Sequence, residues 1–129
     1  MSVEVSELTR LFESGQIDPE SFSHESHLLV AYDMLRKYDF MDAATRYVQG
    51  IKSLAESVGV PEKVNITVTL AFLSVIAERI TQSHHSDFER FLEENSDLLS
   101  RNLLKNWYTD DQLASDLART SFVMPAKAA

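Results

Sequence analysis

One segment of the sequence, residues 64–82, is apolar on two sides when it is drawn as a helix, and this limits the fold more than any other feature. Its β-branched residues would also suit a strand, but its length and its lack of strict alternation favour a helix. The first side carries Val64, Val68, Ala71, Phe72 and Val75, and the second carries Ile66, Leu70, Leu73, Ile76 and Ile80. Because such a helix must be buried on two sides, we expect residues 64–82 to form the central helix of an all-α domain.

Shorter amphipathic patterns precede this segment. The first predicted element is a short helix that carries Leu8, Leu11 and Phe12 and ends at Gly15, and a loop over residues 17–22 follows it. A second helix begins after the N-cap Ser23 and ends near Tyr38. A third helix runs from the N-cap Asp39 to Val58 and is followed by Gly59 and Pro61. Side-chain oxygens of serine and aspartate cap helix starts, and glycine commonly follows helix ends.

Two capping-box patterns predict helix starts in the C-terminal third, one over residues 86–89 and one over residues 109–112. The first helix would bury Phe88, Phe91 and Leu92, and the second would bury Leu113 and Leu117. We expect another short helix over residues 98–108 and a loose tail over residues 126–129. The prediction is one domain, residues 1–129, folded as an irregular bundle of six or seven helices.

The composition excludes several classes of function. A chain of 129 residues fits one domain, and its formal net charge of −8 argues against binding to nucleic acid or to an anionic membrane surface. The absence of cysteine removes disulfides and thiolate chemistry. The N-terminus has no apolar run, and the apolar stretch of residues 64–77 is shorter than the ~20 residues that span a bilayer. We therefore expect a cytoplasmic protein.

A His-x-x-His pair, His24 and His27, stands at the start of the second predicted helix. Residues three apart on a helix share a face, with Cβ atoms roughly 5–6 Å apart, which suits two imidazoles on one cation. The zinc-protease signature needs histidines four apart, so that reading fails. The alternative is that His24 lies in solvent while His27 packs against a neighbour, and the helix dipole then favours neutral rings.

Other polar residues have simpler interpretations. Asn65 and Thr69 lie on one line of the central helix, where they either satisfy free backbone groups or face a cavity. His84 and His85 are adjacent and diverge by about 100° on a helix, so they cannot share a face. The sequence contains no glycine-rich phosphate loop, no nucleophile elbow and no EF-hand loop.

Several motifs, in their order and spacing, resemble a group of small uncharacterised bacterial proteins. The matching segments are Phe22-Ser23-His24-Glu25-Ser26-His27-Leu28 with Val30 and Ala31, Gly59-Val60-Pro61-Glu62-Lys63, Leu103-Leu104, Trp107-Tyr108-Thr109, Leu113, Ser115, Ala118-Arg119 and Phe122-Val123-Met124-Pro125. They resemble that group's Phe-Thr-His-x-x-His opening, its Gly-Val-Pro-x-Lys lead-in and its Ala-Arg…Phe-Val-x-Pro ending. The likeness covers residues 22–125.

One departure bears on the chemistry. After the lead-in the group reads Tyr-His-Glu-Thr-x-Thr, whereas this chain has Asn65 in place of the histidine and keeps Thr67 and Thr69. The resemblance implies a polar site in which His24 and His27 are retained and Asn65 replaces the third imidazole. An amide oxygen is a poor ligand for a transition metal, and the general base that the glutamate would supply is missing.

Three hypotheses follow for the function. The first is a helical domain that binds a small ligand or a protein partner, without a cofactor, at a polar pocket formed by His24, His27, Asn65 and Thr69, with Arg119 as an anion contact. The second is a metal-dependent enzyme that uses His24 and His27 as ligands of a divalent cation. The third is an acidic adaptor that forms a homodimer through exposed apolar helix faces.

Overall fold

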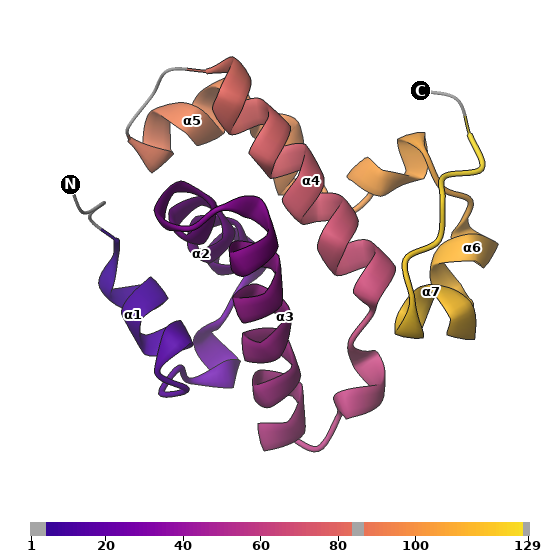
Figure 1. The fold of residues 1–129 in the computed structure, drawn as a ribbon, viewed down its shortest axis with the longest axis horizontal. Helices are drawn as coiled ribbons and strands as arrows, with labels where there is room; N and C mark the ends of the chain where they lie inside the picture. Colours follow the sequence, from indigo (N-terminus) through magenta and orange to yellow (C-terminus); the bar gives the residue numbers. More distant parts are fainter. Residues whose placement is uncertain (1–4, 84–86, 128–129) are drawn as a thin grey trace.

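The computed structural model describes residues 5–83 and 87–127, and in these ranges the chain is helical and contains no strand (Figure 1). The helices are α1 (Glu7–Glu13), α2 (His24–Lys37), α3 (Phe40–Ser57), α4 (Ile66–Gln82), α5 (Phe88–Glu94), α6 (Asp110–Ala114) and α7 (Asp116–Thr120). Four short 3₁₀ helices connect them: η1 (Pro19–Ser21), η2 (Pro61–Lys63), η3 (Ser96–Leu99) and η4 (Leu103–Asn106). The predicted all-α bundle is confirmed.

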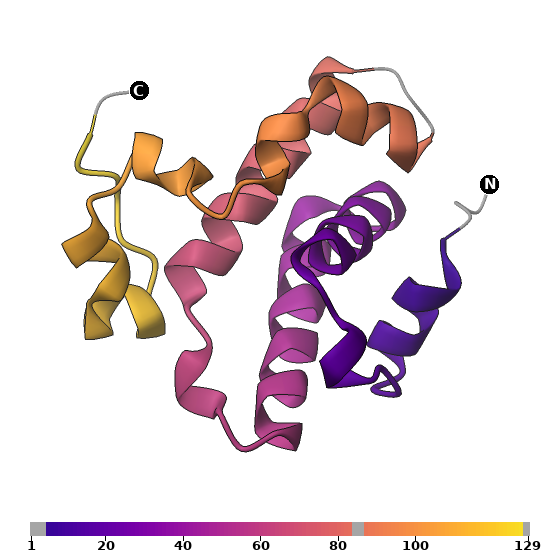
Figure 2. The same cartoon turned by 180° about the vertical axis from the view of Figure 1, so that it is seen from behind.

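Helix α4 lies at the centre, as its two apolar sides predict. It contacts α2 and α3 on one side and α7 and η4 on the other, and Figures 1 and 2 show α6 and α7 across α4 from α1, α2 and α3. Leu73 and Ile76 belong to the larger core, which also includes Tyr32 and Phe91. The opposite side of α4 packs Ala71 into a smaller core with Leu104 and Tyr108. Burial on both sides places α4 between these two cores.

The predicted caps position the helices that carry the site. The Ser23 side chain accepts a hydrogen bond from the backbone N–H of Ser26 at the start of α2, and Asp39 does the same for α3. Gly59 follows α3 with φ +75°, a backbone conformation that residues other than glycine rarely adopt. These signals are local in the sequence, so they fix the ends of α2 and α3 directly.

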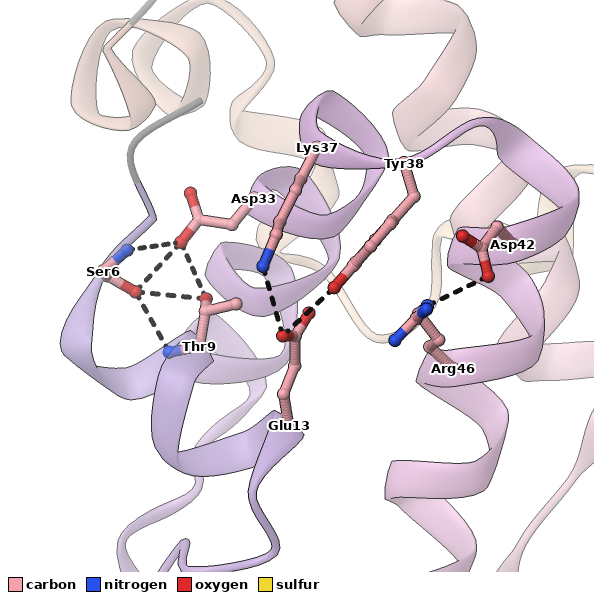
Figure 3. Close-up of polar contacts among 8 residues, drawn as sticks. All are labelled: Ser6, Thr9, Glu13, Asp33, Lys37, Tyr38, Asp42 and Arg46. Atoms are coloured by element: carbon pink, nitrogen blue, oxygen red, sulfur yellow. Dashed lines mark hydrogen bonds and ion pairs between the residues drawn. The ribbon is translucent and has the colours of Figure 1, made fainter. Parts of the chain in front are cut away.

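Polar contacts attach α1 to the helices behind it (Figure 3). The Oδ2 atom of Asp33 accepts hydrogen bonds from the Ser6 backbone N–H at 3.0 Å, the Ser6 hydroxyl at 2.9 Å and the Thr9 hydroxyl at 2.7 Å. Glu13 accepts from Lys37 and from the Tyr38 hydroxyl at the other end of α1. Helix α1 is therefore held to α2 at both of its ends.

Several predictions for the C-terminal third are corrected. Residues 98–108 do not form one α-helix. They contain the last two residues of η3 and all of η4, with a connection between them. The last predicted helix is divided at Ser115, which ends α6 and caps α7, and Leu117 is 65% exposed instead of buried. The capping box at Thr109 with Gln112 is confirmed. Such short segments are held by tertiary contacts that local periodicity does not report.

The start of α5 also differs from the prediction. Asp87 is the N-cap, and its side chain accepts a hydrogen bond from the Glu89 backbone N–H. Ser86, the predicted cap, lies outside the described residues, as do His84 and His85. Among the helices that the structure describes, none combines the length and the apolar character needed to cross a bilayer.

Candidate functional site

A cavity of about 400 Å³ lies between α2, α3 and α4, and it gathers four of the residues that the sequence nominated. The nominated residues that line it are His24, His27, Asn65 and Thr69. The apolar part of the wall consists of Leu28, Ala31, Ile51, Val64, Val68, Phe72, Leu73 and Ile76, and the lining is completed by Tyr47, Lys63 and Arg101. The polar groups come mainly from the first turns of α2 and α4, and the apolar groups come mainly from later turns.

His24 is the first residue of α2 and is held by two contacts. Its Nε2 atom lies 3.0 Å from the carbonyl oxygen of Leu98, and because a carbonyl only accepts, Nε2 carries the proton and donates. The ring stands edge-on to Phe72, with centroids 5.6 Å apart. In the neutral ring this leaves Nδ1 as the acceptor, and no described residue donates a hydrogen bond to it.

His27 is fixed in the opposite tautomer. Its Nδ1 atom lies 2.8 Å from the Ser23 carbonyl oxygen and donates to it, so Nε2 is the acceptor of the neutral ring. The imidazole packs against Phe22, with ring centroids 4.3 Å apart. Burial lowers the pKa of His27 below its ordinary value, and the charges of His24 and Arg101 lower it further, although the bond to Ser23 acts in the other direction. A neutral ring at His27 agrees with the sequence interpretation, but burial is the main cause.

Asn65 has both ends of its amide engaged. As the N-cap of α4, its Oδ1 accepts from the Val68 backbone N–H at 3.0 Å, and its Nδ2 donates to the Leu113 carbonyl at 2.8 Å. The Thr69 hydroxyl donates back to the Asn65 carbonyl at 2.8 Å. Both side chains border the cavity and also stabilise the helix start, so the two interpretations of these residues are compatible.

Arg119 is not brought to this cavity. It lies on α7, where its guanidinium pairs with Asp116 one turn earlier at 3.5 Å, and it is absent from the lining. The cationic groups that do border the cavity are Lys63, at the end of η2, and Arg101, between η3 and η4. Lys63 ends the Gly-Val-Pro-Glu-Lys lead-in, so the motif gave a signal for it. Arg101 had no such signal, because its segment was expected to be helical.

Tyr47 closes the cavity from α3. Its hydroxyl donates a long hydrogen bond, 3.4 Å, to the carbonyl oxygen of His27. The residue is only 6% exposed, and burial raises the pKa of its phenol, so the hydroxyl stays protonated. The ring forms part of the cavity wall, and the hydroxyl acts as a hydrogen-bond donor.

The donor set for a metal is incomplete in the described part of the chain. No group of three His, Asp or Glu side chains that could hold a metal lies together there, and the chain has no cysteine. His24 and His27 are the two residues of this cavity with nitrogen ligands to offer a metal. A cation held by them would take its remaining ligands from water or from a bound molecule.

Comparisons of the chain with protein-family models, with curated proteins and with solved structures give no significant match. The resemblance noted from the sequence therefore stays a prediction, and the geometry of the cavity carries the functional interpretation.

Proposed function

We propose that this protein binds a small organic molecule in the cavity between α2, α3 and α4. The observation that supports this is the combination of a volume of about 400 Å³ with a mainly apolar wall and a few oriented polar groups. Small-molecule sites commonly have volumes of about 300–1,000 Å³ and this type of lining. The ligand's apolar part would contact residues such as Leu28 and Phe72, and a hydrogen-bond donor on the ligand would contact an acceptor nitrogen of His24 or His27.

The polar groups are preorganised for binding. Protein hydrogen bonds fix one nitrogen in each imidazole, so the acceptor nitrogens, Nδ1 of His24 and Nε2 of His27, remain for a ligand. Groups that are already oriented lose little side-chain entropy when the ligand arrives. This favours recognition of a specific small molecule over a nonspecific apolar contact.

A screen of small organic fragments by NMR tests this proposal. Fragments that bind should shift the amide signals of residues in α2, α3 and α4, and a Val68→Phe variant, which fills part of the cavity, should lose these shifts. Leu117→Phe is the matched control, because Leu117 is exposed on α7. If no fragment shifts the cavity residues, or if Val68→Phe binds as well as the wild type, the proposal is wrong.

A second candidate function is a metal-dependent enzyme. The observation that favours it is that His24 and His27 border one cavity and each has a ring nitrogen without a hydrogen-bond partner among the described residues. Metal analysis of protein purified without an affinity tag distinguishes the candidates. Stoichiometric zinc, iron or manganese that disappears in a His24→Ala/His27→Ala variant would favour the enzyme, and its absence from the wild type would count against it.

A further inference from the structure

The charged residues around the cavity point to a class of ligand. This inference rests on the proposed function, because it requires that the cavity binds a small molecule. We propose that the cavity binds an organic anion: a carboxylate whose head group contacts Lys63 and Arg101 and whose apolar body lies between α2, α3 and α4. The lining contains these two cations, and it contains neither aspartate nor glutamate.

This lining differs in charge from the chain as a whole. The protein has 20 acidic residues and 12 basic ones, so its formal net charge is −8. A cavity that borders only basic and neutral groups is therefore a local positive site on an acidic molecule. Low-dielectric walls strengthen the attraction between such a site and an anion, and the surrounding negative charge disfavours anions elsewhere on the surface.

The two cations are free to bind an anion. Among the described residues, neither Lys63 nor Arg101 forms an ion pair with a carboxylate. Six other basic side chains in the described ranges form such pairs, namely Arg10, Lys37, Arg46, Arg79, Lys105 and Arg119, and four more, Arg36, Lys52, Arg90 and Lys127, have none there and lie outside the cavity. A guanidinium presents two parallel N–H groups that match a carboxylate, so Arg101 is suited to the head group.

Arg101 is close enough to act inside the cavity. It lines the same cavity as His27, and its positive charge is the smallest of the causes that lower the pKa of that imidazole. Lys63 lies two residues before Asn65, at the start of the chain segment that forms the α4 wall. The cations thus come from two different connections, one before α4 and one after η3, and both border the same space.

The volume limits the size of the ligand. At the ~30 Å³ that a water molecule occupies in the liquid, about 400 Å³ accommodates roughly a dozen non-hydrogen atoms. Decanoate and phenylbutanoate have about this size and differ in the shape of the apolar body. Each has a neutral carboxamide of nearly the same shape, which isolates the contribution of the charge.

The decisive experiment compares these carboxylates with their carboxamides by isothermal titration calorimetry and NMR. We expect at least one carboxylate to bind in the cavity about tenfold to a hundredfold more tightly than its carboxamide, as charge-assisted hydrogen bonds predict. In a Lys63→Gln/Arg101→Gln variant this preference should fall to near one. The matched control is Lys52→Gln/Arg90→Gln, which changes the net charge equally at residues outside the lining and should keep the preference.

The possible outcomes separate this inference from the proposed function. Equal binding of carboxylate and carboxamide in the wild type would overturn the inference alone, as would fragment binding in the cavity without any carboxylate binding. Retention of the preference in the Lys63→Gln/Arg101→Gln variant would also overturn it. Failure of every fragment and every probe to shift the cavity residues would overturn the proposed function itself. The wild-type comparison does not depend on the folding of any variant.

Discussion

Gly50 on α3 faces the ring of Phe12 on α1, and a Cβ atom at this position would lie far closer to two ring carbons than van der Waals contact allows. The ring has little room to move, because it is 3% exposed and packs against Phe22 and Tyr47. We expect Gly50→Ala to lower the free energy of unfolding by about 1–2 kcal/mol, since overpacking outweighs the gain in helix propensity. Urea denaturation measures this change. The control Gln49→Ala, at an exposed neighbour, should stay within about 0.5 kcal/mol.

His27 makes the stability depend on pH. Its pKa in the folded protein lies below the ordinary value of 6.5, mainly because of burial, so the unfolded chain binds the proton more readily. The stability from a neutral His27 is therefore fully present above pH 6.5 and is lost as the pH falls from 6.5 towards the lowered pKa. We expect a His27→Gln variant to lose less stability than the wild type between pH 8 and pH 5, as measured by urea denaturation. Equal losses in the two proteins would contradict this assignment.

The N-terminal end of α1 is attached to α2 through the buried carboxylate of Asp33. Its 5% exposed side chain accepts three hydrogen bonds from Ser6 and Thr9 (Figure 3). Asp33→Asn should cost about 1–3 kcal/mol, because the neutral amide accepts these bonds more weakly and adds donors that lack partners. Hydrogen exchange should show faster opening of α1 than of α4. Asp42→Asn, which alters an exposed ion pair with Arg46, should cost less than about 1 kcal/mol.

Thr67 on α4 holds the C-terminal segment against the bundle. Its buried hydroxyl donates to the Ser121 carbonyl at 2.6 Å and accepts from the Val123 backbone N–H at 3.0 Å. Thr67→Val keeps the shape but removes both bonds, and we expect a loss of about 1–3 kcal/mol in thermal unfolding. The control Thr81→Val, at an exposed position whose hydroxyl bonds only to its own helix, should have little effect. Unchanged exchange at Val123 in Thr67→Val would refute this role.

The elements that the sequence predicted best are those with local end signals. The caps at Ser23 and Asp39 are formed as expected, because a cap needs only residues within one turn. Residues 98–108 were expected to be one helix, yet they contain two 3₁₀ turns that Leu98, Leu103 and Leu104 anchor in the core. That anchoring depends on partners distant in the sequence, so periodicity alone does not reveal it.

The difference between local signals and long-range packing also explains which residues of the cavity the sequence predicted. His24 and His27 share a helix face, so their convergence follows from spacing, and the central position of α4 brings Asn65 and Thr69 near them. Arg101 reaches the cavity through a connection whose path is set by the packing of η3 and η4, and Arg119 is carried away on α7.

At the scale of the whole molecule, the cavity joins the three longest helices, α2, α3 and α4, and the connection after η3, so a ligand that fills it contacts all of these elements at once. A ligand that binds only the folded state at a concentration of about 100 Kd adds about 2.7 kcal/mol to the free energy of unfolding. For a domain of this size that corresponds to a rise of about 10 °C in Tm. We expect this rise with the tightest-binding carboxylate in a thermal-shift experiment, and we expect it to shrink at high salt, because Lys63 and Arg101 are exposed and screened by ions. A shift that is independent of salt would indicate that apolar contacts alone hold the ligand.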